Sequence, residues 1–117
     1  MVRLIVNGAA GRMGRRLVAL ATEDPELTLV AALERPDHPA VGTDAGILAG
    51  IPELGLPLAV SSPAAADVVV DFSSPASALP MIDVCAARGM AIVVGTTGMG
   101  ADAEERLAAA ARSIPCL

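Results

Sequence analysis

The sequence predicts an α/β fold in which helices cover both faces of a doubly wound parallel sheet. Short apolar runs rich in Val, Ile and Leu alternate along the chain with longer segments of helical spacing. The runs are continuously apolar, as expected of parallel strands that are buried on both faces. With 117 residues the chain has the length of one domain, so residues 1–117 are interpreted as a single unit.

The strands are predicted from apolar runs that end at Gly, Asp, Ser or Asn. Four clear runs and one weak run, at Leu58–Val60, fit this description. The clear runs are Arg3–Asn7, Leu27–Leu33, Val68–Phe72 and Ala91–Val94. Ile114–Leu117 resembles a strand that has barely begun, so the pattern predicts a sheet truncated near its sixth strand.

The first helix is predicted to begin after Gly11 and to end at Glu23–Pro25, because the residue before a proline avoids helical geometry. Its expected inner face carries Met13, Leu17 and Ala21, with Leu20 beside them.

Two more helices are predicted, over Pro75–Arg88 and about Ala101–Arg112. Ser74 and Pro75 form an N-cap and N1 signature, and Gly89 is placed to end the first of the two. Pro80 is expected to kink that helix or to delay its start. The Gly- and Pro-rich segment 37–57 is expected to be a loop with at most one helical turn.

Composition argues against several classes of protein. The chain is 54% hydrophobic and 18% charged, which argues against disorder. Its net charge is −5 and its eight basic residues, all arginine, form no stripe, so we expect no nucleic-acid partner. No apolar run could span a bilayer and no signal peptide precedes the first strand, so we expect no membrane contact and a cytoplasmic location. Cys85 is predicted to be a small core residue.

The strongest chemical signal is the glycine-rich turn between the first strand and the first helix. It has the spacing G-x-x-G-x-x-G and consists of Gly8, Ala9, Ala10, Gly11, Arg12, Met13 and Gly14. Small residues allow the backbone to approach a pyrophosphate, and a helix N-terminus offers N–H groups and partial positive charge. The turn predicts a Rossmann-type dinucleotide site, the alternative being a structural turn without a ligand.

Glu34 and Arg35 follow the second strand. A carboxylate at this place accepts hydrogen bonds from adenosine ribose hydroxyls, which favours NADH. An arginine beside it can meet a 2′-phosphate, which favours NADPH. Both cofactors therefore remain open, as does the alternative of an ordinary exposed charge pair.

Two further strand ends carry candidate contacts. Gly95, Thr96 and Thr97 follow the fourth clear strand, where their backbone and hydroxyl groups are expected at the nicotinamide end of the cofactor. Phe72 either packs on the cofactor or fills the core. His38 has no partner at metal or triad spacing and is not expected to be catalytic, and no metal site is predicted.

Together these segments resemble the 4-hydroxy-tetrahydrodipicolinate reductases, also called dihydrodipicolinate reductases. The resemblance extends over essentially the whole chain and rests on motifs in the family's order and spacing. These are 6–14, 32–34, 42–46, 70–73 and 94–98. It implies that Arg12 and Met13 lie along the cofactor, that Glu34 holds the adenosine ribose and that Arg35 assists NADPH. It also implies that Thr97 lies near the substrate. Ser73 stands where the family often has threonine.

The resemblance implies hydride transfer from NADPH or NADH to 4-hydroxy-tetrahydrodipicolinate, giving tetrahydrodipicolinate, in lysine and diaminopimelate biosynthesis. Family members are longer and carry a C-terminal domain with a His-His pair and a lysine for the substrate, which also forms a homotetramer. We therefore expect no catalytic residue within 1–117, and nucleotide binding with little or no turnover. The alternatives are the cofactor domain of another dehydrogenase and a non-catalytic nucleotide-binding module.

Overall fold

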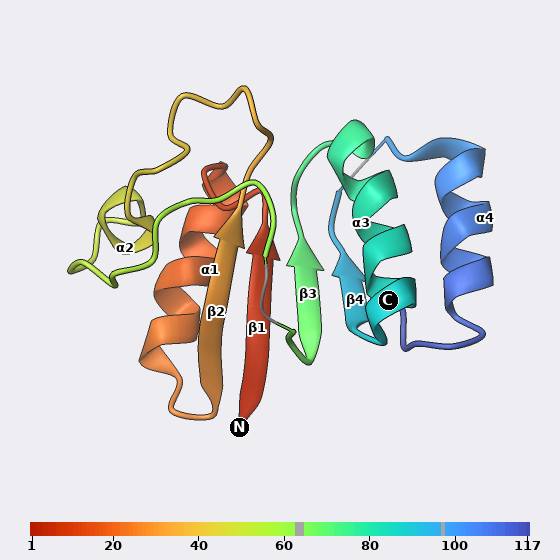
Figure 1. The fold of residues 1–117 in the computed structure, drawn as a ribbon, viewed down its shortest axis with the longest axis horizontal. Coiled ribbons are helices and arrows are strands. Elements are labelled where there is room, and N and C mark those ends of the chain that lie inside the picture. Colours follow the sequence, from red (N-terminus) through yellow and green to blue (C-terminus); the bar gives the residue numbers. More distant parts are fainter. Residues whose placement is uncertain (63–64, 97) are drawn as a thin grey trace.

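The computed structural model describes residues 1–62, 65–96 and 98–117, and it confirms the doubly wound α/β fold (Figure 1). Four parallel strands form one sheet in the order β2-β1-β3-β4. Their bounds are Val2–Asn7 for β1, Leu27–Leu33 for β2, Val68–Asp71 for β3 and Ala91–Val94 for β4. The carboxyl ends of all four strands therefore lie at one edge of the sheet.

Both outer edges of the sheet are extended by a single parallel bridge. Ala59 pairs with Leu33 beside β2, and Cys116 pairs with Ile92 beside β4. The segment predicted as the start of a strand near Leu117 does pair, because Leu117 N–H donates to the Ile92 carbonyl at 3.0 Å. The strand predicted at Leu58–Val60 forms only a bridge, in which Ala59 N–H donates to the Ala32 carbonyl at 3.0 Å, while Leu58 N–H donates to Thr43 in the neighbouring loop at 2.8 Å.

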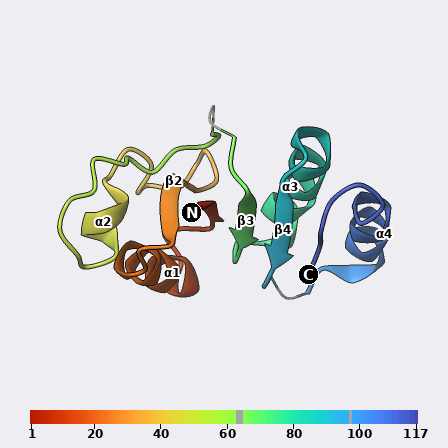
Figure 2. The ribbon, with the colours of Figure 1, turned by 90° about the horizontal axis from the view of Figure 1, so that it is seen from below.

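Helices cover both faces of the sheet, as Figure 2 shows with α1 and α3 on opposite sides. The four helices are α1 (Arg12–Glu23), α2 (Ala45–Leu48), α3 (Pro75–Arg88) and α4 (Gly100–Ala110). The alternation along β1 divides the core: Leu4 and Val6 pack in the cluster of α1, whereas Ile5 packs with Ile82 of α3.

The buried face of α1 agrees with the predicted one at Ala21, which is buried, and at Leu17, which is half-buried against the core, but differs at other positions. Gly14, Val18 and Ala21 are buried, whereas Met13 and Leu20 are 48% and 45% exposed. The absence of a side chain at Gly14 lets the helix approach the sheet along this line. The buried face of α1 is therefore rotated about the helix axis, away from the larger side chains for which the sequence predicted burial.

The bounds of α3 are those predicted, and its ends explain why. The Ser74 hydroxyl accepts from Ser77 N–H at 3.3 Å, and Gly89 ends the helix at φ +69°. Of the two effects expected of Pro80, the delayed start does not occur, because the helix begins at Pro75 and continues through Pro80. Ala76, whose carbonyl loses a partner to this proline, is exposed, so water can solvate that carbonyl.

Cys85 is a core residue, as predicted. It is fully buried in α3, and burial raises the pKa of its thiol to about 12. The group therefore stays a neutral thiol at physiological pH. In the part of the chain that the structure describes, no helix is long and apolar enough to cross a membrane.

The loop between β2 and β3 is organised by Asp44, the N-cap of α2. Its carboxylate accepts from the backbone N–H groups of Gly46 (2.9 Å), Ile47 (3.2 Å), Leu54 (3.0 Å) and Leu56 (2.8 Å). These bonds, that from Leu54 first, lower the pKa of Asp44 below its ordinary 3.8.

The lowered pKa of Asp44 predicts a specific acid sensitivity. A carboxyl whose folded pKa is depressed stabilises the fold above its unfolded pKa, and the contribution is lost as pH falls through the folded value. Asp44→Asn should therefore be less stable than wild type near pH 7, and the difference should shrink below about pH 4. Urea unfolding followed across this range measures it; a difference independent of pH would contradict the expectation.

Candidate functional site

The glycine-rich turn after β1 is packed too closely for side chains at two of its three glycines. Gly8 has φ +83°, and a Cβ there would lie 2.6 Å from the Phe72 carbonyl oxygen. A Cβ at Gly14 would lie 2.0 Å from the Gly8 carbonyl oxygen. Gly11 has φ −74°, and its Cβ would meet only the Gly8 carbonyl oxygen, at 3.3 Å. Gly8 and Gly14 are thus required by the fold itself, whereas Gly11 leaves its outer side open.

The backbone N–H groups of the turn are largely used within the protein. Those of Gly8 and Ala9 both donate to the Leu33 carbonyl, at 2.9 and 3.0 Å, and Gly11 N–H donates to the Gly8 carbonyl at 3.1 Å. The first turn of α1 differs, because its N-cap, Gly11, supplies no side-chain cap and no acidic residue lies there. An anion would therefore meet the start of the helix, at Arg12 and Met13.

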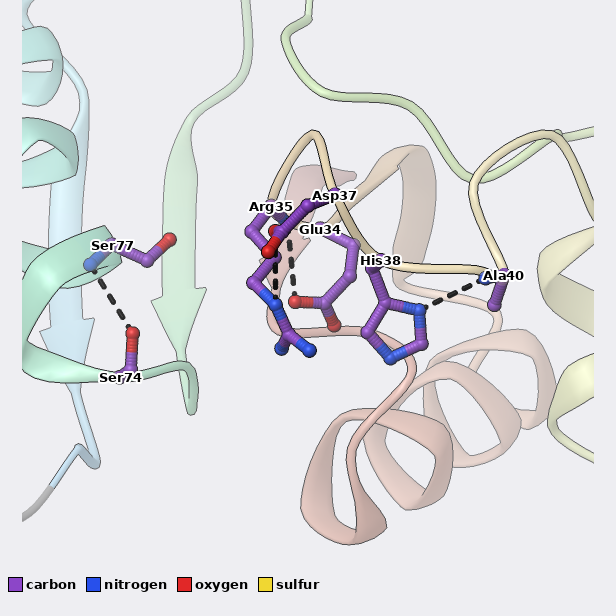
Figure 3. Close-up of polar contacts among 7 residues, drawn as sticks. All are labelled: Glu34, Arg35, Asp37, His38, Ala40, Ser74 and Ser77. Carbon is purple, nitrogen blue, oxygen red and sulfur yellow. Dashed lines mark hydrogen bonds and ion pairs between the residues drawn. The ribbon is translucent and has the colours of Figure 1, made fainter.

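Glu34 is connected directly to this turn. Its carboxylate, on a residue only 9% exposed, accepts from Ala10 N–H at 3.2 Å and from Arg35 N–H at 3.2 Å. Arg35 turns instead to Asp37, with 3.1 Å between its Nε and the carboxylate (Figure 3). Glu34 and Arg35 are therefore not an exposed charge pair with each other, and Glu34 belongs to the turn.

A buried carboxylate, Asp71, lies at the end of β3. It accepts from Asn7 Nδ2 at 2.8 Å, from Ser73 N–H and Oγ at 3.0 and 2.7 Å, and from Thr96 Oγ1 at 2.7 Å. The sequence indicated Asp71 as a strand end and as part of the motif 70–73, without a role of its own. An acidic residue closing an otherwise apolar run was the available signal, but its partners lie far away in sequence.

Phe72 and Gly95 lie against each other beside this network. A Cβ at Gly95 would come within 2.2 Å of the Phe72 ring, so the ring packs on the glycine backbone. The same ring lines a small cavity beside Gly8. Phe72 is half-buried and is not among the residues of either core cluster, and its contact with the cofactor stays a prediction. Thr97 lies outside the described residues.

Two cavities adjoin the carboxyl ends of β1, β2 and β3. The smaller, of about 160 Å³, lies next to Gly8 and Gly11 and is also lined by His38. The larger, of about 390 Å³, has mainly apolar walls that include Leu33, Met81 and Met90. Four residues line both: Glu34, Arg35, Ser74 and Ser77. Together they form one path along the sheet edge.

The position of His38 was not foreseen. Its Nδ1 accepts from Ala40 N–H at 3.0 Å, which holds the ring in its loop beside Glu34 (Figure 3). Serines 73, 74 and 77 line the same small cavity. No group of three His, Cys, Asp or Glu side chains within 1–62, 65–96 and 98–117 comes together to hold a metal ion.

The parallel sheet, the glycine turn leading into an uncapped helix and the acidic residue after β2 define a class. This is the Rossmann-type cofactor domain of dehydrogenases. The domain is similar to aspartate semialdehyde dehydrogenase with NADP from Candida albicans, with TM-score 0.65, 18% identity, and coverage of 83% of this chain and 30% of that one. It is also similar to dipicolinate-bound dihydrodipicolinate reductase from Paenisporosarcina sp. TG-14, with TM-score 0.69 and 20% identity over 92% and 42% of the two chains.

Sequence comparison places the chain more narrowly. Residues 2–117 match the family model described as "Dihydrodipicolinate reductase, N-terminus", and the chain belongs to this family. The family comprises NAD(P)-dependent oxidoreductases of lysine biosynthesis, and its N-terminal domain is a dinucleotide-binding domain.

Curated relatives agree with this assignment. The chain is 46% identical to 4-hydroxy-tetrahydrodipicolinate reductase of Anaeromyxobacter sp. (strain Fw109-5), covering 98% of this chain and 43% of the relative. It is 45% identical to that of Geotalea daltonii, covering 100% and 45%. The chain thus spans less than half the length of these relatives.

Proposed function

We propose that this chain binds NADH or NADPH as the cofactor domain of a 4-hydroxy-tetrahydrodipicolinate reductase. The observation that carries the proposal is the turn itself, in which Gly8 and Gly14 admit no side chain while the start of α1 is left uncapped. Bound there, the cofactor supplies the hydride that gives tetrahydrodipicolinate. The residues of this chain bind and orient it.

The path of cavities supports an extended placement of the dinucleotide. The pyrophosphate would lie over Gly11, which leaves room for it, and at the start of α1, where Arg12 and Met13 offer backbone N–H groups and Arg12 positive charge. Glu34 would accept from the adenosine ribose, and the adjoining apolar cavity of about 390 Å³ suits an aromatic base. Gly95 and Thr96, after β4, are left for the nicotinamide end.

For the whole enzyme, the proposal also includes a substrate and an oligomeric state. By relationship to the curated reductases, we infer a small-molecule substrate, a second domain that binds and protonates it, and a homotetramer formed through that domain, in the cytoplasm. Thr97 is proposed as a contact near the substrate. We propose no catalytic residue within 1–117, so this chain alone should bind nucleotide without appreciable turnover.

The decisive experiment is titration of the chain with NADH and with NADPH. Binding is measured by the change in cofactor fluorescence and by calorimetry. Saturable binding of at least one cofactor is expected. A folded chain that binds neither would refute the proposal. Reductase activity should be measured on the same chain and on a longer protein that includes the second domain, where turnover is expected only with the latter.

Glu34→Gln should shift the cofactor preference towards NADPH. The amide oxygen still accepts from Ala10 N–H, but the charged acceptor for the ribose hydroxyls is lost, and a hydrogen bond to a charged group contributes about 1.5–3 kcal/mol. NADH affinity should therefore fall roughly tenfold or more. NADPH affinity should fall less, because the repulsion between the carboxylate and a 2′-phosphate is removed.

The matched control for this variant is Glu53→Gln, which removes one negative charge at an exposed position outside the site. It should bind both cofactors as wild type does. An equal loss of NADH and NADPH affinity in Glu34→Gln would show that Glu34 supports the turn without hydrogen bonding to the ribose hydroxyls.

A further inference from the structure

We propose that Asp71 is a positioning residue that fixes Thr96, the second residue after β4, for the nicotinamide half of the cofactor by holding the Thr96 hydroxyl. This inference rests on the proposed function, since it assigns a task within the same site. It concerns a residue to which the sequence analysis, although it includes the motif 70–73, assigned no role.

The Asp71 carboxylate is fully buried, and its hydrogen-bond partners are neutral donors. Oδ1 accepts from Ser73 N–H, Ser73 Oγ and Thr96 Oγ1, while Oδ2 accepts from Asn7 Nδ2. Burial of a carboxylate is costly unless such bonds compensate it, and bonds to a charged acceptor are stronger than neutral ones. The arrangement therefore holds its donors firmly in place.

The donors come from three different segments of the chain at the same edge of the sheet. Asn7 ends β1 and precedes the glycine turn, Ser73 lies between β3 and α3, and Thr96 follows β4. Ligands of open α/β sheets bind at this edge. One carboxylate thus sets the position of Thr96, directly beyond β4, relative to the turn proposed for the pyrophosphate.

The direction of the Thr96 hydroxyl is the specific observation. It donates to Asp71 Oδ1 at 2.7 Å, so it is engaged inside the protein, whereas the sequence suggested that it faces the cofactor. Gly95 N–H also donates to the Asp71 backbone carbonyl at 2.7 Å, and the Phe72 ring packs on Gly95. Thr96 would then serve the cofactor through its backbone, placed by Asp71.

The test compares Thr96→Val with Thr96→Ser in the 117-residue chain. Valine preserves the shape of threonine but removes the donor, and serine keeps the donor. Each variant is titrated with NADH and with ADP, which lacks the nicotinamide and its ribose. Thr96→Val should bind NADH about tenfold more weakly, equivalent to about 1.4 kcal/mol. Its ADP affinity should be unchanged, and Thr96→Ser should bind both ligands as wild type does.

A double-mutant cycle then assigns the effect to Asp71. Asp71→Ala should weaken NADH binding at least as much as Thr96→Val, and adding Thr96→Val to it should cause no further loss. Circular dichroism and thermal unfolding establish that each variant is folded. Should Asp71→Ala fail to fold, the comparison of Thr96→Val with Thr96→Ser decides alone.

The inference would be overturned by unchanged NADH affinity in Thr96→Val, by equal losses for NADH and ADP, or by equal losses in the valine and serine variants. The last result would mean that the methyl group, not the hydroxyl, matters. These failures differ from failure of the proposed function, in which the wild-type chain itself would bind neither NADH nor NADPH.

Discussion

Gly14→Ala should destabilise the fold and weaken NADH binding by tenfold or more. The added methyl would lie 2.0 Å from the Gly8 carbonyl oxygen and 2.7 Å from the Ala9 Cα, and both are backbone atoms that cannot rotate away. The start of α1 must therefore move off the glycine turn. Overpacking of this kind costs about 1–3 kcal/mol. Urea unfolding and NADH titration measure the two effects.

Gly11→Ala is the matched control for stability, because it adds the same methyl group to the same turn. Gly11 has φ −74°, which suits alanine, and its new Cβ would contact only one atom at 3.3 Å. Its effect on unfolding should be about 1 kcal/mol or less. Weaker NADH binding in a stable Gly11→Ala chain would support close approach of the pyrophosphate. Equal stability losses at positions 11 and 14 would contradict the packing argument.

Ile82→Ala should produce the largest loss of stability among single core truncations on α3. Ile82 is fully buried in the cluster that joins α3 to the sheet through Ile5 and Val69. Truncation of a buried isoleucine removes its transfer free energy and leaves a cavity, at a cost of about 2–5 kcal/mol. That is a large part of the 5–15 kcal/mol typical of a domain. Urea unfolding followed by circular dichroism measures the change.

Val84→Ala, two residues further along α3, provides the comparison. Val84 is 36% exposed, so truncation removes little buried surface, and alanine favours the helix more than valine does. The loss should be below about 1 kcal/mol. Similar losses of unfolding free energy in Ile82→Ala and Val84→Ala would mean that α3 does not have one side buried against the sheet and another side exposed.

Local rules predicted α3 and the turn well because their signals are contained in a few neighbouring residues. Ser74, Pro75 and Gly89 specify the ends of α3 through capping and a positive φ, whatever the rest of the chain does. Pro80 misled the same reasoning, since the cost of a proline depends on whether water reaches the carbonyl that it leaves unpaired. That is a property of the surface, and Ala76 is exposed.

In the candidate site, too, the sequence predicted local features but not the contacts between distant residues. Glu34 was identified from its place after β2, but its bond to Ala10 joins positions 24 residues apart. Arg35 is predicted to meet a 2′-phosphate, and the structure adds an ion pair between its Nε and Asp37, two residues further along the chain. The Asp71 network joins residues up to 64 positions apart, so no local pattern predicts it.

By itself the sequence determined the α/β class, the strand–turn–helix unit around Gly8–Gly14 and the resemblance to one reductase family. These three features depend on backbone sterics, on apolar periodicity and on motif spacing, all of which involve residues that are close together in the sequence. Only the tertiary structure decided which face of α1 is buried, where the Thr96 hydroxyl points and what surrounds Asp71. Each of these depends on which distant backbone comes within hydrogen-bonding or contact distance once the sheet has formed.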